Sequence, residues 1–145
     1  MKTMTRTGPY TFDDFCHLVR DGQKADLIDE GIYIASPEST GANDLFVWLL
    51  SLLKFFVQRQ KSGKVFGSRV AFRLDTQNSP EPDIAFMRKE RLDLVHRGYV
   101  DGPPDLAVEI VSPESVDRDY DTKRRQYEEA GVPEYWIVDE LLWTN

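Results

Sequence analysis

The pattern of apolar and polar positions predicts several short strands separated by a few helices. Residues 10–22 carry apolar side chains at helical spacing, whereas residues 26–35 carry two short apolar runs around a polar turn. The first pattern indicates an amphipathic helix and the second a β-hairpin. Residues 45–61 are apolar on nearly every side, so we expect a long helix that is largely buried.

More elements follow the long helix. A last helix opens at Ser115 or Asp117, and residues 134–139 form a final apolar strand. Three strands are predicted between the two helices, at residues 64–74, 83–87 and 105–111, with a short helix at residues 89–98. Hairpins combined with one strand–helix–strand crossover predict an α/β or α+β fold, with a mixed central sheet flanked by helices. The length of 145 residues suits a single domain covering residues 1–145.

Charge is distributed unevenly along the chain. The net charge is −7, which argues against a protein that coats nucleic acid non-specifically, but residues 45–74 contain six basic side chains and no acidic one. Two interpretations of this basic segment stay open: an ordinary solvated surface, or a local contact for a polyanion. In the second interpretation Lys64, Arg69 and Arg73 are the candidate nucleic-acid-binding residues.

Two features of the sequence bear on the compartment. Cys16 is the one cysteine of the chain, which excludes an internal disulfide and is typical of a protein in a reducing cytoplasm. The sequence has no uninterrupted run of about 18 apolar residues, and its N-terminal segment is polar. We therefore expect a cytoplasmic protein that does not associate with membranes.

Three charged side chains stand out because of their positions. Glu109 interrupts an apolar strand, and burying a carboxylate is costly unless it is paired, protonated or bound to a metal. Asp83 begins the neighbouring apolar strand. Lys123 shares a helical stripe with Tyr120 and Tyr127, so we expect this stripe to be the inner face of the last helix and Lys123 to point toward the sheet.

These residue types suit metal-assisted chemistry on a phosphate. Two carboxylates on adjacent strands can hold Mg²⁺ or Mn²⁺ with water at the remaining positions, and a lysine beside them can orient a water molecule or stabilise negative charge. A metal ion, a nucleophilic water and a nearby cation are the groups that phosphodiester hydrolysis requires. Each residue also has a structural interpretation: Asp83 as a strand-start residue, Glu109 as an ion-pair partner, and Lys123 as a side chain reaching water.

Three segments resemble one protein family. The segments "EPDIAF", "PPDLAVEIVSPES" and "RDYDTKRRQYEEAGVPEYWIVD" are similar to motifs of the Uma-type family of bacterial restriction endonuclease-like proteins, and the resemblance runs from about Tyr10 to Asp139. It implies the PD-(D/E)xK nuclease fold and an Mg²⁺- or Mn²⁺-dependent endonuclease activity on DNA. Because enzymes of this fold often act as dimers to cut two strands, it also implies a homodimer.

The resemblance also assigns residues. Asp83 matches the aspartate of the "PD" half-motif, and Glu109 matches the acid of the following strand motif. In the simplest nucleases of this fold a lysine follows that acid by two residues, where this chain has Val111. Lys123, on the next helix, is the implied substitute. Asp26 matches an acid at the start of the opening hairpin that supports the metal, so the implied metal ligands are Asp83, Glu109 and Asp26.

Two departures from the family pattern leave alternatives open. The family's long helix begins with a histidine, where the nearest residue here is Asn43, and its members continue past Asp139 with further strands. We therefore expect a chain truncated at its C-terminal end, a divergent member or an inactive remnant. The alternative function is a catalytically inactive nuclease-fold module that binds nucleic acid or a protein partner. A third interpretation is purely structural, with Glu109 paired to Lys123.

Overall fold

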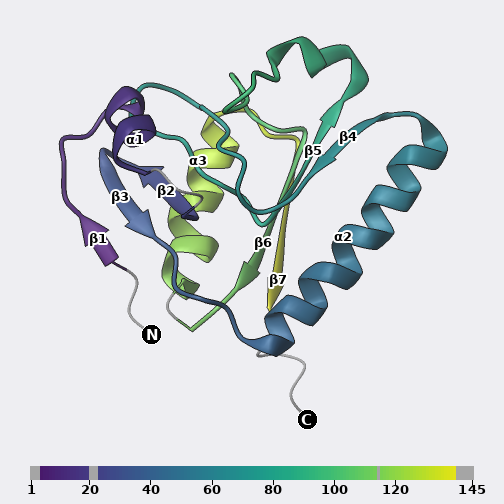
Figure 1. Ribbon diagram of the computed structural model, residues 1–145, viewed down its shortest axis with the longest axis horizontal. Coiled ribbons are helices and arrows are strands. Elements are labelled where there is room, and N and C mark those ends of the chain that lie inside the picture. The colour runs from purple at the N-terminus through teal and green to yellow at the C-terminus, as the bar shows by residue number, and fades with distance from the viewer. Residues whose placement is uncertain (1–3, 20–22, 114, 140–145) are drawn as a thin grey trace.

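The computed structural model describes residues 4–19, 23–113 and 115–139, which form two β-sheets and the helices around them (Figure 1). The smaller sheet is antiparallel with the order β1-β3-β2. Its strands are β1 (Met4–Arg6), β2 (Ala25–Ile28) and β3 (Gly31–Ile34). The larger sheet has the order β4-β5-β6-β7. Its strands are β4 (Gly63–Phe66), β5 (Ile84–Arg88), β6 (Leu106–Val111) and β7 (Glu134–Asp139).

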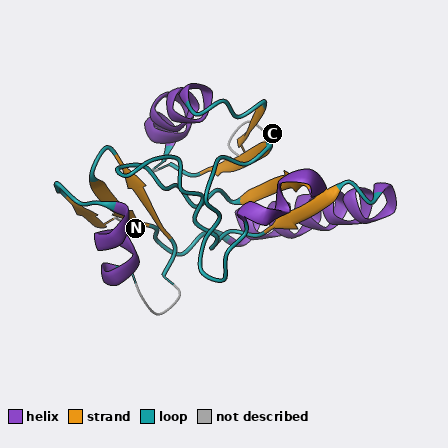
Figure 2. Ribbon diagram, turned by 90° about the horizontal axis from the view of Figure 1, so that it is seen from above, coloured by secondary structure: helices purple, strands orange, loops and turns teal. Residues whose placement is uncertain are grey.

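The helical elements lie around these sheets. In Figure 2 the smaller sheet and α1 occupy one side of the molecule and α2 the other. The α-helices are α1 (Phe12–Leu18), α2 (Thr40–Gln60) and α3 (Lys123–Glu129), with a 3₁₀ turn η1 (Lys89–Leu94) and a π-helical turn η2 (Arg118–Thr122). The chain from β6 through η2 and α3 to β7 is a crossover, because β6 and β7 pair in parallel.

Local chemistry explains where several elements begin and turn. Thr11 and Asp14 form a capping box at the start of α1, and the Ser39 side chain accepts the backbone N–H of Ala42 at the start of α2. The β2–β3 hairpin turns at Asp29 and Glu30, whose φ angles of 46° and 66° are both left-handed. Two consecutive left-handed residues are what a tight hairpin turn requires, so the predicted hairpin is confirmed.

Opposite faces of β6 meet different environments. Leu106 and Val108 pack with Ile84 and Leu49 in a core shared with α2, whereas the next residue, Glu109, faces α3, where it accepts a hydrogen bond from Lys123. Successive side chains of a strand point to opposite faces. The larger sheet therefore has an apolar face under α2 and a face that carries charge under α3.

The predicted strand at residues 64–74 is only partly formed. β4 ends at Phe66, and the rest of the segment is irregular apart from an isolated parallel bridge between Phe72 and Val100. Phe72 and Leu74 instead donate their backbone N–H groups to the carbonyls of Pro80 and Asn78. The alternating apolar and polar residues of this segment therefore belong to an extended chain that forms hydrogen bonds with loops rather than with a strand. The predicted C-terminal end of the first helix, residues 20–22, lies outside the described residues.

The expectation that the long helix is largely buried is wrong. In α2 only Ala42, Leu49 and Val57 are buried, because the larger sheet covers one face of the helix. α2 is also the one helix of the described residues that could span a membrane by length and composition, with 17% of its most apolar window buried. A helix that packs one face on a sheet meets the same criterion, so this is weak evidence for a membrane span.

The inner face of the last helix also differs from the prediction. Asp119, Lys123 and Tyr127 are buried, whereas Tyr120 is 36% exposed. The cause is the π-helical turn η2, which takes an extra residue per turn and so moves Asp119 to the inside in place of Tyr120. Lys123 nevertheless points toward the sheet, as predicted.

Candidate functional site

The two predicted acids of the larger sheet lie side by side. β5 and β6 pair with Ile84 opposite Val108, so Asp83, directly before β5, is level with Glu109. The Asp83 carboxylate is fixed there, because its Oδ2 accepts the backbone N–H of Ile110 at 2.6 Å. The hydrogen-bond register of two strands therefore brings these carboxylates together.

Lys123 joins three elements at this point. Its Nζ lies 3.0 Å from Glu109 Oε1, 3.0 Å from Asp26 Oδ2 and 3.7 Å from Asp119 Oδ1. All four side chains are at least nine-tenths buried. The predicted residues Asp26, Glu109 and Lys123 are thus in direct contact, although they come from the smaller sheet, the larger sheet and α3.

A second lysine, which the sequence did not single out, completes the cluster. Lys24 forms an ion pair with Asp83, and only about a fifth of its side chain is exposed. The available signal was alternation, because Lys24 and Asp26 are two residues apart at the start of β2 and so point the same way. The missed Asp119 had a similar signal: it lies four residues before Lys123, one helical turn away.

Neighbouring polar groups hold the cluster in place. The Tyr127 hydroxyl donates to Glu109 Oε1 at 3.0 Å, and the Glu81 backbone N–H donates to Asp26 Oδ1 at 2.7 Å. The Ser115 hydroxyl donates to Asp119 Oδ2 at 2.5 Å. Glu109, Asp26 and Asp119 therefore each have one hydrogen-bond donor besides Lys123, which fixes their orientation.

Burial and charge set the protonation of the cluster. Burial raises the pKa of Glu109 to about 8, and the ammonium of Lys123 offsets this only in part. Burial also acts to raise the pKa of Asp26, but Lys123 and Lys24 outweigh it, so that this pKa is lowered. Burial opposes the charge of Lys123, but the surrounding carboxylates outweigh it and raise its pKa well above the ordinary value. Lys123 is therefore a permanent cation.

The cluster contains more carboxylates than ammonium groups. Lys24 and Lys123 face four acids, namely Asp26, Asp83, Glu109 and Asp119. Because the pKa of Glu109 is about 8, the excess is negative once Glu109 has lost its proton, and a bound divalent cation favours that ionised form. Within the described ranges no three Asp, Glu, His or Cys side chains form a ready metal site, but Mg²⁺ is commonly held by one or two carboxylates and water. Asp83 and Glu109 fit that donor set.

A cleft of about 950 Å³ opens onto the cluster. Asp83, Glu109 and Lys123 line it, together with the guanidinium-bearing side chains of Arg69 and Arg118. Of the three basic residues predicted to contact nucleic acid, only Arg69 lines this cleft. Arg73 pairs with Asp101 at 3.3 Å, and Lys64 lies over the Phe66 ring. Arg118, missed because it stands among acids, is the second arginine at the cleft.

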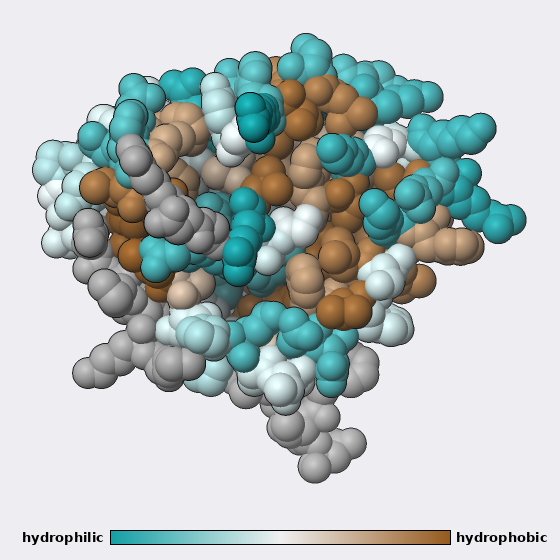
Figure 3. Space-filling model, viewed as in Figure 1, coloured by the Kyte–Doolittle hydropathy of each residue, from teal (hydrophilic) through white to brown (hydrophobic). Residues whose placement is uncertain are grey.

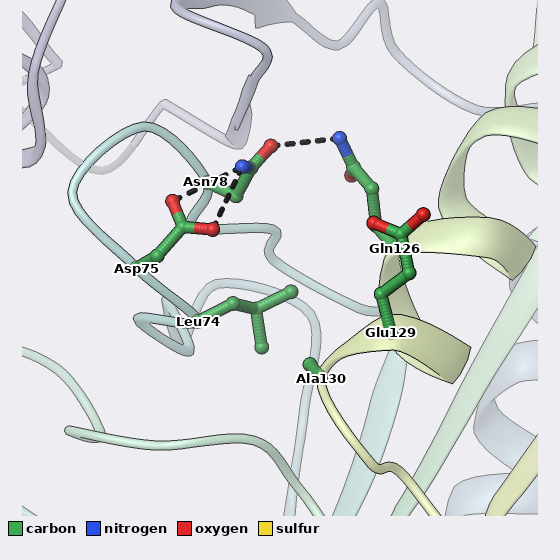
Figure 4. Close-up of a pocket in the computed structure, with 6 residues that line it drawn as sticks. All are labelled: Leu74, Asp75, Asn78, Gln126, Glu129 and Ala130. Carbon is green, nitrogen blue, oxygen red and sulfur yellow. Dashed lines mark hydrogen bonds between the residues drawn. The ribbon is translucent and has the colours of Figure 1, made fainter.

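A smaller pocket lies beside α3 and away from the cluster. It has a volume of about 160 Å³ and contains none of the predicted site residues. Figure 4 shows residues that line it, among which Asn78 joins Gln126 and Asp75 by hydrogen bonds. These bonds tie the loop before β5 to α3, so this pocket supports the site structurally.

Comparison with known proteins identifies a family and a similar fold. Residues 11–141 match the model of the Uma2 family, which is described as "Putative restriction endonuclease". No curated protein matches the chain. Among solved structures the chain is similar to "a putative nuclease belonging to DUF820" from Anabaena variabilis. The TM-score is 0.76 and the identity is 19%, over 90% of this chain and 74% of that chain.

The two matches establish different things. At 19% identity the structural match shows the fold, so the mixed-sheet, restriction-endonuclease-like fold predicted from the resemblance is confirmed. The family match extends over nearly the whole chain, including every residue of the buried cluster. The chain belongs to the Uma2 family.

Proposed function

We propose that the protein is a metal-dependent endonuclease that hydrolyses DNA phosphodiester bonds in the cleft around Asp83, Glu109 and Lys123. The observation that carries the proposal is the meeting of two carboxylates on adjacent strands with a buried lysine at 3.0 Å from one of them. A structural ion pair needs only one of those acids. The second acid and the open cleft favour a site that acts on a ligand.

Each side chain has a role in the proposed site. Asp83 and Glu109 would hold Mg²⁺ or Mn²⁺, with support from Asp26. A divalent cation there would supply charge stabilisation at the phosphate and a more nucleophilic water. Lys123, kept protonated by its carboxylates, would stabilise negative charge on the phosphate. Tyr127 keeps its proton because burial raises its pKa well above the ordinary value, and it holds Glu109 in position.

The cleft wall supplies a separate contribution to binding. Arg69 and Arg118 line the cleft beside the acids, where they would contact backbone phosphates of DNA. Such contacts offset the repulsion between an acidic protein and a polyanion. Because phosphate contacts carry no base information, the proposal makes no statement about sequence specificity.

The experiment is cleavage of supercoiled plasmid in the presence of Mg²⁺ or Mn²⁺. We expect nicked and linear products from the wild type, and a loss of about a hundredfold or more in rate for Glu109→Gln, which keeps the shape of the side chain and removes the charge. Glu134→Gln, an exposed acid on β7, is the matched control and should cleave like the wild type. Equal rates for Glu109→Gln and the wild type would refute the assignment.

One contact favours a second candidate function, a nuclease-fold module that binds nucleic acid without cutting it. The ion pair between Lys24 and Asp83 satisfies an acid that a nuclease needs for its metal. A module of this kind would shift labelled DNA in a gel, with an affinity that falls as salt rises. It would give no product at any Mg²⁺ or Mn²⁺ concentration, which distinguishes it from the enzyme.

A further inference from the structure

The helix α2 has two apolar faces, of which one packs on the larger sheet and the other is exposed. Its inner face packs on the larger sheet through Leu49 and its neighbours. On the opposite face five large apolar side chains are each at least half exposed: Val47, Trp48, Leu52, Phe55 and Phe56. We call these five residues the outer face of α2. In Figure 3 hydrophobic residues gather along the side of the molecule where Figure 1 places this helix.

The apolar area of the outer face is larger than that of single apolar residues scattered over a protein surface. Trp48, Phe55 and Phe56 are 62%, 64% and 57% exposed, and an aromatic side chain can bury about 150–250 Å². These three residues alone therefore expose on the order of 300–450 Å², before Val47 and Leu52 are included. Apolar patches of this size are among the largest that monomeric proteins expose, and they are often functional.

The sequence of α2 is symmetric about its centre in a way that suits a second copy of itself. Trp48 and Phe55 lie three positions to either side of the central pair Ser51–Leu52. Val47 and Phe56 lie four positions to either side of the same pair. If two α2 helices pack antiparallel about this centre, each aromatic residue of one copy meets a large apolar residue of the other. A two-fold interface of this kind uses the same patch on both copies.

Charge follows the same symmetry. Asp44 and Arg59 lie seven positions to either side of the centre and are both exposed. At about 100° per residue both fall within the angular range of the outer face. In the antiparallel arrangement Asp44 of each copy lies opposite Arg59 of the other, and neither makes an ion pair within the described part of the chain.

The centre of the helix permits close approach. Ser51 is the small residue of the stripe, and its hydroxyl donates to the Val47 carbonyl at 2.7 Å. Because that hydroxyl already has its partner, Ser51 can be buried against Leu52 of a second copy without leaving a polar group unpaired.

We propose that the outer face of α2 is a self-association surface, through which two copies of the chain pair their α2 helices antiparallel about Ser51 and Leu52. A membrane surface suits the face less well, because Asp44 stands within the stripe. Ala42 in the first turn of α2 and the capping residue Ser39 line the cleft, whereas the outer face does not, so the pairing leaves both clefts open. The proposal does not depend on the nuclease activity.

The test is sedimentation velocity of the full chain over a range from low to several hundred micromolar. We expect a reversible monomer–dimer equilibrium, because an interface of this area is at the lower end of specific contacts. Asp44→Arg and Arg59→Asp each place like charges together at both ends and should raise the dimer dissociation constant about tenfold. The double variant restores both pairs and should return to within about threefold of the wild type.

Two further variants separate this surface from others. Trp48→Gln with Phe55→Gln replaces exposed residues only, so the fold should persist by circular dichroism while the dimer is lost. Arg124→Glu, exposed on α3 rather than on α2, is the control and should dimerise like the wild type.

Four outcomes would overturn the proposal. The first is a monomer at every concentration, as when another segment covers the face, and the second is a dimer insensitive to the aromatic substitutions. The third is a double charge variant as weak as the single ones, because it excludes the antiparallel register. The fourth is a monomer that binds vesicles of phosphatidylcholine and phosphatidylglycerol, because it assigns the face to a membrane surface.

Discussion

Glu81 gives the sharpest prediction about stability. It is 6% exposed, and its side chain accepts the backbone N–H of Ala25 at 3.1 Å. Burial raises its pKa from the ordinary 4.5 to about 8. The change is Glu81→Gln, which keeps an oxygen acceptor for Ala25 and removes the titration. Because Glu81 is not among the proposed metal ligands, the experiment probes the fold rather than the reaction.

The direction follows from proton binding. Below pH 4.5 Glu81 is protonated in both the folded and the unfolded chain, and its contribution to stability is fully present. Between pH 4.5 and about 8 the unfolded chain releases the proton while the folded chain keeps it, so the free energy of unfolding falls as pH rises. Above that pKa both states are ionised and the loss is complete.

The magnitude follows from the width of that window. Each pH unit corresponds to about 1.4 kcal/mol, so the full shift in pKa represents about 5 kcal/mol. Relaxation of the ionised site reduces this, and we expect a loss on the order of 3–5 kcal/mol in the wild type. The Gln variant loses none of it. The variant should therefore match the wild type near pH 4.5 and exceed it in stability near pH 9.

The assay is urea unfolding followed by far-ultraviolet circular dichroism at a series of pH values. Contributions from the other acids cancel in the difference between the two proteins. Glu90→Gln, an exposed acid, is the control and should give a difference that does not vary with pH. A difference between Glu81→Gln and the wild type that is equally independent of pH would refute the reasoning.

Three more predictions concern the cluster and the cleft. Lys123→Met leaves buried acids without their cation and should lower the free energy of unfolding by about 3–5 kcal/mol in urea titrations; a loss below about 1 kcal/mol would contradict the buried ion pairs. Lys24→Met removes the cation from Asp83 and should strengthen Mn²⁺ binding about tenfold by calorimetry, whereas unchanged binding would show that this lysine does not compete. Arg69→Ala should weaken DNA binding and reduce the salt slope by about one, while Lys64→Ala, which is outside the cleft, should not.

The positions of Asp83 and Glu109 could be predicted from the sequence because both residues lie on or beside strands that pair with each other. Asp83 begins one apolar run and Glu109 interrupts another, and both runs have the pattern of strands. When two such strands pair, the two acids come close together. Lys123 was predicted to point inward from helical spacing alone. These inferences depended on local patterns of two or four residues, which a sequence displays directly.

The rest of the cluster had only weak local signals, and its position depended on features that a sequence does not display. Lys24 belongs to the cluster because the edge of the smaller sheet lies against the start of β5, where Lys24 pairs with Asp83. No local pattern in a sequence fixes the relative position of two sheets. The π-helical turn moved Asp119 inward, although a period of 3.6 residues places Tyr120 there. The exposure of α2 was missed for a similar reason. An apolar pattern shows that a helix face can be buried, but it does not show whether the rest of the chain covers that face.

The two candidate functions differ most clearly at Lys24. The excess of acids over lysines means that the cluster can be neutralised by its own ammonium groups or by an added cation. In a nuclease Lys24 must leave Asp83 when the acid acts as a ligand, so the substitution Lys24→Met should strengthen metal binding without abolishing cleavage. In a binding module Lys24 is a permanent structural partner, so the same substitution should leave metal binding absent and lower the free energy of unfolding. One variant, measured by calorimetry and by urea unfolding, therefore separates an enzyme from an inactive relative even before a substrate is known.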